Sequence, residues 1–119
     1  MYARVSEIVL DCPDPDDMAA FYCALTGWQV VNREDDWVSI KGDGDVKLAF
    51  QLAPDHVAPQ WPDPGHPQQL HLDFMVDDAD EAQKWAIDLG ARLLDASPEH
   101  DTFRVYADPA GHPFCLCTG

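Results

Sequence analysis

The sequence predicts an α+β fold built from two copies of one βαβββ module. Two observations support this prediction. Apolar residues with the helical spacing i, i+3, i+4 and i+7 occur twice, starting at Met18 and again at Ala82, so the offset between the copies is 82 − 18 = 64 residues. Segments with the alternation typical of β-strands precede and follow both predicted helices at matching places.

The two predicted helices have matching ends. Asp14 is the expected N-cap of the first helix and Gly27 its expected end, while Asp78 and Gly90 take these places in the second helix. The acidic residues beside both caps complement the helix dipole. We expect each apolar face to pack in the core; the faces consist of Met18, Phe21, Tyr22 and Leu25, and of Ala82, Trp85, Ala86 and Leu89.

Strand-forming segments surround each helix in the order β-α-β-β-β. In the first predicted strands, 5–12 and 69–76, alternate residues face the helix. Their opposite faces carry polar groups at equivalent places, Glu7 and Asp11 in one copy and His71 and Asp73 in the other. The later strands are expected after the glycine at each helix end, at 37–40 and 46–52 in the first copy, and at 102–107 and 113–117 in the second.

The whole chain, 1–119, is expected to form one domain, since 119 residues suffice for a hydrophobic core. Module one covers about 1–53 and module two about 70–119. Residues 54–69 contain five of the ten prolines. Because proline fixes φ and lacks an N–H, this segment is expected to be an extended connector.

Charge excludes two classes of partner. The chain has 22 Asp and Glu against seven Lys and Arg, a net charge of −15. Binding to nucleic acid or an anionic membrane needs clustered cations, so we expect neither partner. No apolar run approaches the ~18 residues of a membrane span, and no signal peptide is recognised, so we expect a cytoplasmic protein with reduced thiols.

Several stretches resemble the vicinal oxygen chelate superfamily, which includes glyoxalases, bleomycin-resistance proteins and extradiol dioxygenases. They are Asp14-Pro15 with Phe21-Tyr22, Leu25-x-Gly27-Trp28, His71-Leu72-Asp73-Phe74, and Asp108-Pro109-Ala110-Gly111-His112-Pro113-Phe114. The runs 61–65 and 68–73 are most similar to the small bacterial glyoxalase-like domain proteins. The resemblance implies a glyoxalase-like fold, with the sheets forming a partly open barrel around a cavity, and it implies a homodimer.

The resemblance also implies a metal site to which each module gives one ligand from its first strand and one from its last. The matching positions are Glu7, Ala49, His71 and Cys115. Ala49 has no ligand atom, so the expected set of Glu7, His71 and Cys115 is incomplete. We therefore expect no resident cofactor. The alternative is a divalent ion, with zinc favoured if Cys115 ligates, because thiolates prefer softer ions.

The candidate ligand cavity is lined by Glu7, Trp37, Gln51, Trp61, His71, Asp73 and Cys115. Glu7 is either a general base or a carboxylate paired with Arg104 or Arg92. His71 is either a metal ligand or a hydrogen-bond partner of Asp73 or Glu7. Trp37 either stacks on a ligand or packs as an ordinary strand aromatic.

These residues leave two main functions open. The first is a glyoxalase-like protein that binds a small aromatic or cationic molecule, as in the bleomycin-resistance branch, without a complete catalytic metal site. The acidic composition favours a cationic ligand. The alternative is a metal-dependent lyase or isomerase of the glyoxalase type, and a non-catalytic scaffold is a third. The sequence does not decide whether the protein is an enzyme.

Overall fold

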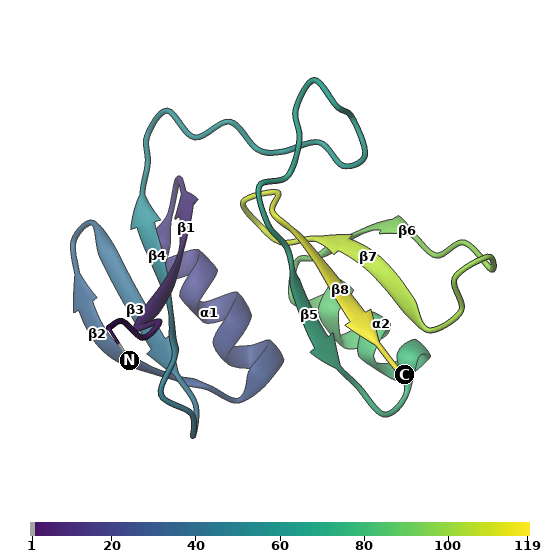
Figure 1. Cartoon of the computed structure of the whole chain (residues 1–119), viewed down its shortest axis with the longest axis horizontal. Helices are drawn as coiled ribbons and strands as arrows, with labels where there is room; N and C mark the ends of the chain where they lie inside the picture. Colours follow the sequence, from purple (N-terminus) through teal and green to yellow (C-terminus); the bar gives the residue numbers. More distant parts are fainter. Residues whose placement is uncertain (1) are drawn as a thin grey trace. The chain divides into compact units, whose positions relative to one another are not determined.

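The structure is a computed structural model that describes residues 2–119. Two compact units divide the chain, one ending at His56 and the other running from Val57 to Gly119. Each unit holds one βαβββ module, as predicted (Figure 1). The elements are β1 (Glu7–Cys12), α1 (Pro15–Thr26), β2 (Gln29–Glu34), β3 (Trp37–Lys41), β4 (Lys47–Leu52), β5 (Leu72–Met75), α2 (Ala79–Asp88), β6 (Arg92–Asp95), β7 (Phe103–Ala107) and β8 (Pro113–Cys117).

The first module is an open four-stranded sheet in the order β1-β4-β3-β2, with α1 against one face (Figure 1). β1 and β4 run parallel, with Val9 opposite Ala49, and the other pairs are antiparallel. Tyr22 of α1 is fully buried and stacks on Phe50 of β4, with ring centroids 5.5 Å apart. The core therefore lies between the helix and the sheet.

The second module repeats this arrangement as β5-β8-β7-β6. β5 and β8 run parallel, with Asp73 opposite Cys115. The rings of Tyr106 and Phe114 are fully buried and stack at 5.4 Å. The pairs Val9–Ala49 and Asp73–Cys115 are thus equivalent places in the two sheets, as the repeat predicts.

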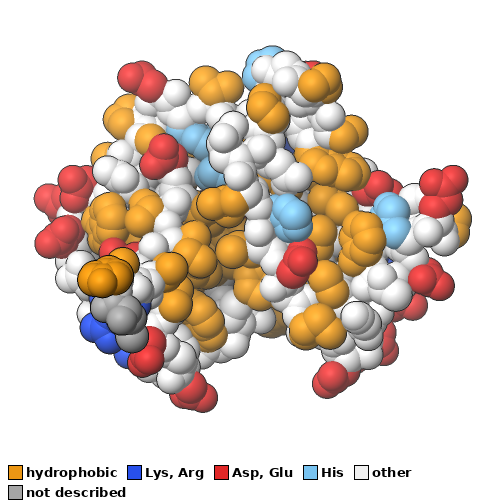
Figure 2. All heavy atoms as spheres, viewed as in Figure 1, with side chains coloured by type: hydrophobic (Ala, Val, Ile, Leu, Met, Phe, Trp, Pro, Cys, Tyr) orange, Lys and Arg blue, Asp and Glu red, His pale blue; other side chains and the backbone are white. Residues whose placement is uncertain are grey.

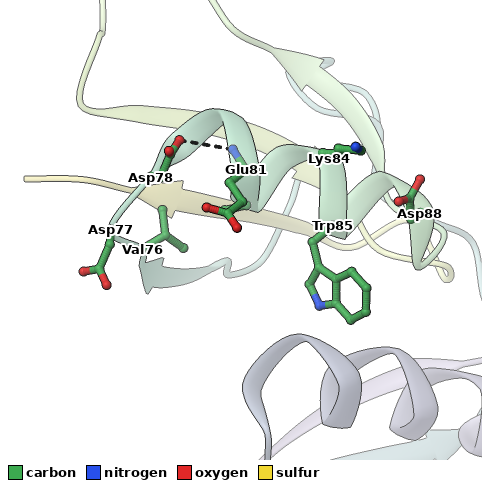
Figure 3. Close-up of a pocket in the computed structure, with 8 residues that line it drawn as sticks. Val76, Asp77, Asp78, Glu81, Lys84, Trp85 and Asp88 are labelled. Atoms are coloured by element: carbon green, nitrogen blue, oxygen red, sulfur yellow. Dashed lines mark hydrogen bonds between the residues drawn. The ribbon is translucent and has the colours of Figure 1, made fainter.

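Both helix starts are capped as expected. The Asp14 Oδ1 accepts a hydrogen bond from the Asp17 backbone N–H at 3.1 Å, and Asp78 Oδ1 does the same for Glu81 at 3.1 Å (Figure 3). At the end of α1, Gly27 adopts φ = 78°, a left-handed conformation that glycine takes without steric cost.

The prediction that Trp85 packs in the core is wrong, since 51% of this residue is exposed. The helix is turned so that Gln83 and the fully buried Ala86 face the sheet. The Gln83 Oε1 accepts hydrogen bonds from Tyr106 Oη at 2.9 Å and from Arg104 Nη1 at 3.1 Å. These polar contacts between helix and sheet are invisible to an apolar pattern. The Trp85 side chain instead projects from the side of α2 (Figure 3).

The first strand of the second module is shorter than expected, because β5 begins at Leu72 rather than at residue 69. Leu72 stands opposite Phe114, so the next pair back would set His71 against Pro113. The proline nitrogen carries no hydrogen and cannot extend the ladder. His71 therefore stands just before the strand. Among residues 2–119, neither helix has the length and apolar character needed to span a bilayer.

Candidate functional site

The sheet face of the second module that lies opposite α2 carries a pocket of about 380 Å³. The residues that decide its chemistry are Trp61, His71, Asp73, Phe103, Val105 and Cys115. Trp61 comes from the proline-rich connector, and the others come from β5, β7 and β8 or the residue before β5. The pocket therefore joins aromatic and apolar walls to a small group of polar side chains.

Strand pairing explains why these side chains meet. Cys115 of β8 stands between Asp73 of β5 and Val105 of β7. Phe103 stands opposite Cys117, two residues before Val105 on β7 and two residues after Cys115 on β8. Because alternate residues of a strand share a face, all five project to the same side of the sheet.

His71, Asp73 and Cys115 form the polar part of this pocket. The His71 Nε2 lies 3.3 Å from the Asp73 Oδ1, and one ligand atom from each of the three residues lies within 4.8 Å of the others. The side chains of His71 and Asp73 are 42% and 61% exposed, whereas Cys115 is buried. The carboxylate is thus open to a ligand from solvent, and the thiol lies beneath it.

The Cys115 thiol is held in its protonated form. Burial raises the pKa of this thiol to about 12, and the negative charge and hydrogen bonding of Asp73 add to the shift. A thiol with this pKa is a poor nucleophile at neutral pH. The pocket therefore offers Cys115 as a neutral, polarisable wall unless a metal ion displaces its proton.

The three residues nevertheless form a donor set that zinc accepts. Catalytic zinc sites have three protein ligands drawn from His, Cys, Asp and Glu, with a fourth position open. Ligand atoms around one tetrahedral zinc are about 3.5 Å apart, which the 3.3 Å between His71 and Asp73 already matches. Binding would require loss of the Cys115 proton. This set contains His71 and Cys115 of the expected ligands together with Asp73, while Glu7 belongs to the other compact unit.

Glu7 belongs to a hydrogen-bonded chain on the first sheet. Its Oε1 accepts a hydrogen bond from Ser39 Oγ at 3.0 Å and lies 3.5 Å from Lys47 Nζ. The ion-pair partner is therefore Lys47, which stands opposite Glu7 on β4, and not Arg104, which pairs with Asp80 at 2.9 Å. Glu7 therefore has two polar partners on its own sheet.

The other predicted residues of the first module are accounted for on the same sheet. The Trp37 indole N–H donates to Ser39 Oγ at 2.9 Å, which fixes the ring as part of the strand. Ala49 is fully buried and supplies no ligand atom, and Gln51 is exposed on β4 opposite Trp37. Of the seven candidate cavity residues, the second-module pocket thus unites Trp61, His71, Asp73 and Cys115.

Phe103 and Val105 were missed by the sequence reasoning. Both lie on the segment 102–107 that was predicted as a strand, and both share a face with Cys115 and Cys117. The signal was the alternation of that strand. Alternation shows that Phe103 and Val105 share one face of β7. Only the pairing of β7 with β8 shows that this face is the one that carries Cys115.

A larger hollow of about 500 Å³ lies along α2, between Trp85 and a row of carboxylates (Figure 3). Asp78 and Glu81 belong to the helix start, where Asp78 is occupied as the N-cap. The lining residues include no His or Cys. Since Asp78 and Glu81 serve the helix start, we place the candidate site in the pocket of Asp73 and Cys115.

Known proteins were compared with the chain in sequence and in structure. A family model described as "Glyoxalase-like domain" matches residues 7–117. A comparison with the curated proteins finds no match. Among solved structures, a glyoxalase/bleomycin resistance protein/dioxygenase family enzyme from Burkholderia phytofirmans PsJN is similar with a TM-score of 0.78 and 21% identity, over 98% of both chains.

Two further structures share the fold. The fosfomycin resistance protein FosX from Mesorhizobium loti has a TM-score of 0.73 and 18% identity, over 100% of this chain and 94% of that chain. A glyoxalase-related enzyme from Fulvimarina pelagi has a TM-score of 0.71 and 24% identity, over 98% and 88%. At these identities the likeness shows the fold, and the chemistry depends on the site residues.

Proposed function

Because the chain belongs to the glyoxalase-like domain family, we propose that it binds a small, flat aromatic cation in the pocket of the second module, without needing a metal ion. The observation that carries this proposal is the exposed Asp73 carboxylate in a pocket lined by Trp61 and Phe103. Aromatic walls favour a flat ring, and a carboxylate favours a positive group beside it. The net charge of −15 attracts such a ligand from solution.

Three probes of one shape test the charge preference. Benzamidine is cationic, benzamide is neutral and benzoate is anionic, and all three have the same flat ring. We expect binding in that order, measured by tryptophan fluorescence titration in the presence of EDTA. Equal binding of all three, or tightest binding of benzoate, would contradict the proposal.

Variants locate the binding. Asp73→Asn should lower the affinity for benzamidine about tenfold and leave the affinity for benzamide unchanged, because only the charge-assisted contact is lost. Trp61→Ala should lower the affinity for both ligands, since it removes an aromatic side chain that lines the pocket. The matched control is Asp43→Asn, which removes the same charge from an exposed turn of the first module. A loss as large in this control would show that only the overall charge matters.

The second candidate function is a zinc-dependent lyase or isomerase of the glyoxalase type, favoured by the spacing of His71, Asp73 and Cys115. Bound zinc would act as a Lewis acid on a substrate oxygen. Metal analysis of protein purified without a tag or added metal decides this candidate. About one zinc per chain, lost in Cys115→Ser and retained in Cys117→Ser, supports it. Metal-free, folded protein that gains no thiolate absorption with Co²⁺ excludes it.

A homodimer is also part of the proposal. All six residues of β2 are exposed, including Val31, and β2 is an edge strand of its sheet. Exposed edge strands with apolar residues are sites of pairing between chains. Light scattering after size exclusion should give twice the chain mass. In Val31→Lys the measured mass should fall towards that of the monomer. A monomer at all concentrations would contradict this part.

A further inference from the structure

We propose that the first module carries a separate binding site for a small anion of the phosphate or carboxylate class. The site is a hollow of about 410 Å³ lined by Arg4, Lys41 and Lys47, with Ser6 and Asn32 beside them. It shares no residue with the pocket of the second module, and it does not depend on the function proposed for that pocket. Val31 of the β2 edge also lines the hollow, so the anion site requires that this end of β2 stays open when the chains pair.

The strands hold this hollow in place. Lys47 is the first residue of β4, and its backbone N–H donates to the Ser6 carbonyl at 3.0 Å. Lys41 is the last residue of β3, and Asn32 stands opposite Ser39 on the next strand. The sheet therefore fixes the backbone positions of Lys41, Lys47 and Asn32, whereas Arg4 comes from the segment that precedes β1.

The charge of this hollow is opposite to that of the chain. Its lining includes three of the chain's seven Lys and Arg residues and only one carboxylate, Asp45, although Asp and Glu number 22 in all. In Figure 2 the largest patch of Lys and Arg side chains on the visible face lies over the first module. The lining is thus locally basic on a chain that is acidic overall.

Two of the three cations are available to a ligand. Arg33 and Arg104 are paired with Asp16 and Asp80, and Lys47 lies 3.5 Å from Glu7. By contrast, Arg4 and Lys41 form no ion pair with a carboxylate within the described part of the chain, residues 2–119. The guanidinium supplies a flat pair of donors and the ammonium a point charge, and both suit phosphate and carboxylate oxygens.

The ligand is a small anion and not a polyanion. At physiological ionic strength the Debye length is about 8 Å, so distant carboxylates are screened from a ligand seated in the hollow. A nucleic acid or a membrane surface extends well beyond that distance and meets a chain whose net charge is −15. For a phosphate group or a carboxylate, attraction by the cations of the hollow therefore outweighs repulsion by the rest of the chain. For a long polyanion, the repulsion is larger.

The test is a titration of the whole ¹⁵N-labelled chain with inorganic phosphate, followed by amide chemical shifts. Sodium chloride at matched ionic strength is the reference, and citrate is a second arm that separates a carboxylate preference from a phosphate preference. We expect saturable shifts at Ser6, Asn32 and Lys41 with phosphate or citrate and not with chloride. Shifts that grow linearly with all three salts would overturn the proposal.

Charge-neutral variants locate the effect. Lys41→Gln and Arg4→Gln should each weaken binding about fivefold to tenfold, because each removes one charge-assisted contact. The matched control Lys84→Gln removes the same charge from α2 and should change the affinity less than about twofold. Equal weakening by Lys84→Gln would show that the net charge alone governs binding, and the proposal would fail. Unchanged spectra of the free variants establish that they are folded.

Discussion

The two modules share one backbone plan but use the equivalent face of their sheets differently. On the first sheet, Trp37, Ser39, Glu7 and Lys47 bond to one another in a chain. At the matching places of the second sheet stand Phe103, Val105, His71 and Pro113, which line a pocket. Polar side chains that satisfy each other support the fold, whereas polar side chains beside apolar walls remain available to a ligand.

The largest expected effect tests whether the two modules depend equally on their aromatic cores. Phe50→Ala and Phe114→Ala each remove a fully buried ring that stacks on a tyrosine. Each should lower the free energy of unfolding by about 3–5 kcal/mol, since a lost ring leaves a cavity. Urea unfolding followed by circular dichroism measures this. A loss below about 1 kcal/mol in one variant would show that its module contributes little to stability.

A smaller loss of stability is expected when Ser39 of the first sheet is replaced by valine, the residue at the matching position of the second sheet. Ser39 is 1% exposed, and Val105 takes its place on β7. Ser39→Val should lower the free energy of unfolding by about 1–2 kcal/mol relative to Ser39→Thr. Valine and threonine have the same shape, so the difference isolates the hydroxyl that joins Trp37 to Glu7.

The ligand affinity of Ser39→Val gives a second readout. Benzamidine binding should stay unchanged, since Ser39 does not line the second-module pocket. Equal stability of the valine and threonine variants would contradict a stabilising role for the hydrogen bonds that join Trp37, Ser39 and Glu7.

The smallest effect concerns a histidine that stacks on the pocket wall. The His100 ring lies 4.2 Å from the Phe103 ring, its Nε2 is 3.0 Å from Asp95 Oδ2 and its Nδ1 is 3.1 Å from the Phe103 carbonyl. Both nitrogens thus face acceptors, and only the protonated ring donates from both. The hydrogen bond to Asp95 raises the pKa of His100, and the one from the Ser97 backbone N–H lowers that of Asp95.

The sign of the pH dependence follows from these two directions. A raised histidine pKa gives stability that is complete below the ordinary value of 6.5 and is lost as the pH rises through the folded pKa. The lowered pKa of Asp95 gives stability above 3.8 that is lost as the pH falls. Between pH 6 and 8 the midpoint of thermal unfolding should fall more steeply for the wild type than for His100→Gln. Parallel slopes would contradict this assignment.

The fold was largely predictable because its signals are local. Asp14, Gly27 and Asp78 mark helix ends through hydrogen bonds to the adjacent turn and a left-handed backbone, and strand alternation needs only neighbouring residues. Trp85 was misplaced because the rotation of α2 depends on Gln83 bonding to the side chain of a distant strand. Apolar spacing contains no information on such polar contacts.

The site was less predictable because it depends on register between strands. The repeat matched His71 to Glu7 and Cys115 to Ala49, but the partner of Cys115 became clear only from the pairing with Asp73. Likewise Lys47 partners Glu7 because β1 and β4 run parallel in one particular register, and no sequence pattern distinguished it from Arg104 or Arg92.

The central claim is that the second module, and not the first, holds the pocket for the flat aromatic cation and that this pocket works without metal. The most direct test is a benzamidine titration of EDTA-treated, ¹⁵N-labelled protein. The account predicts saturable amide shifts at Asp73, Phe103 and Cys115, with Glu7 and Ser39 unmoved. Saturable shifts confined to the first module, or binding that appears only after zinc is added, would contradict it.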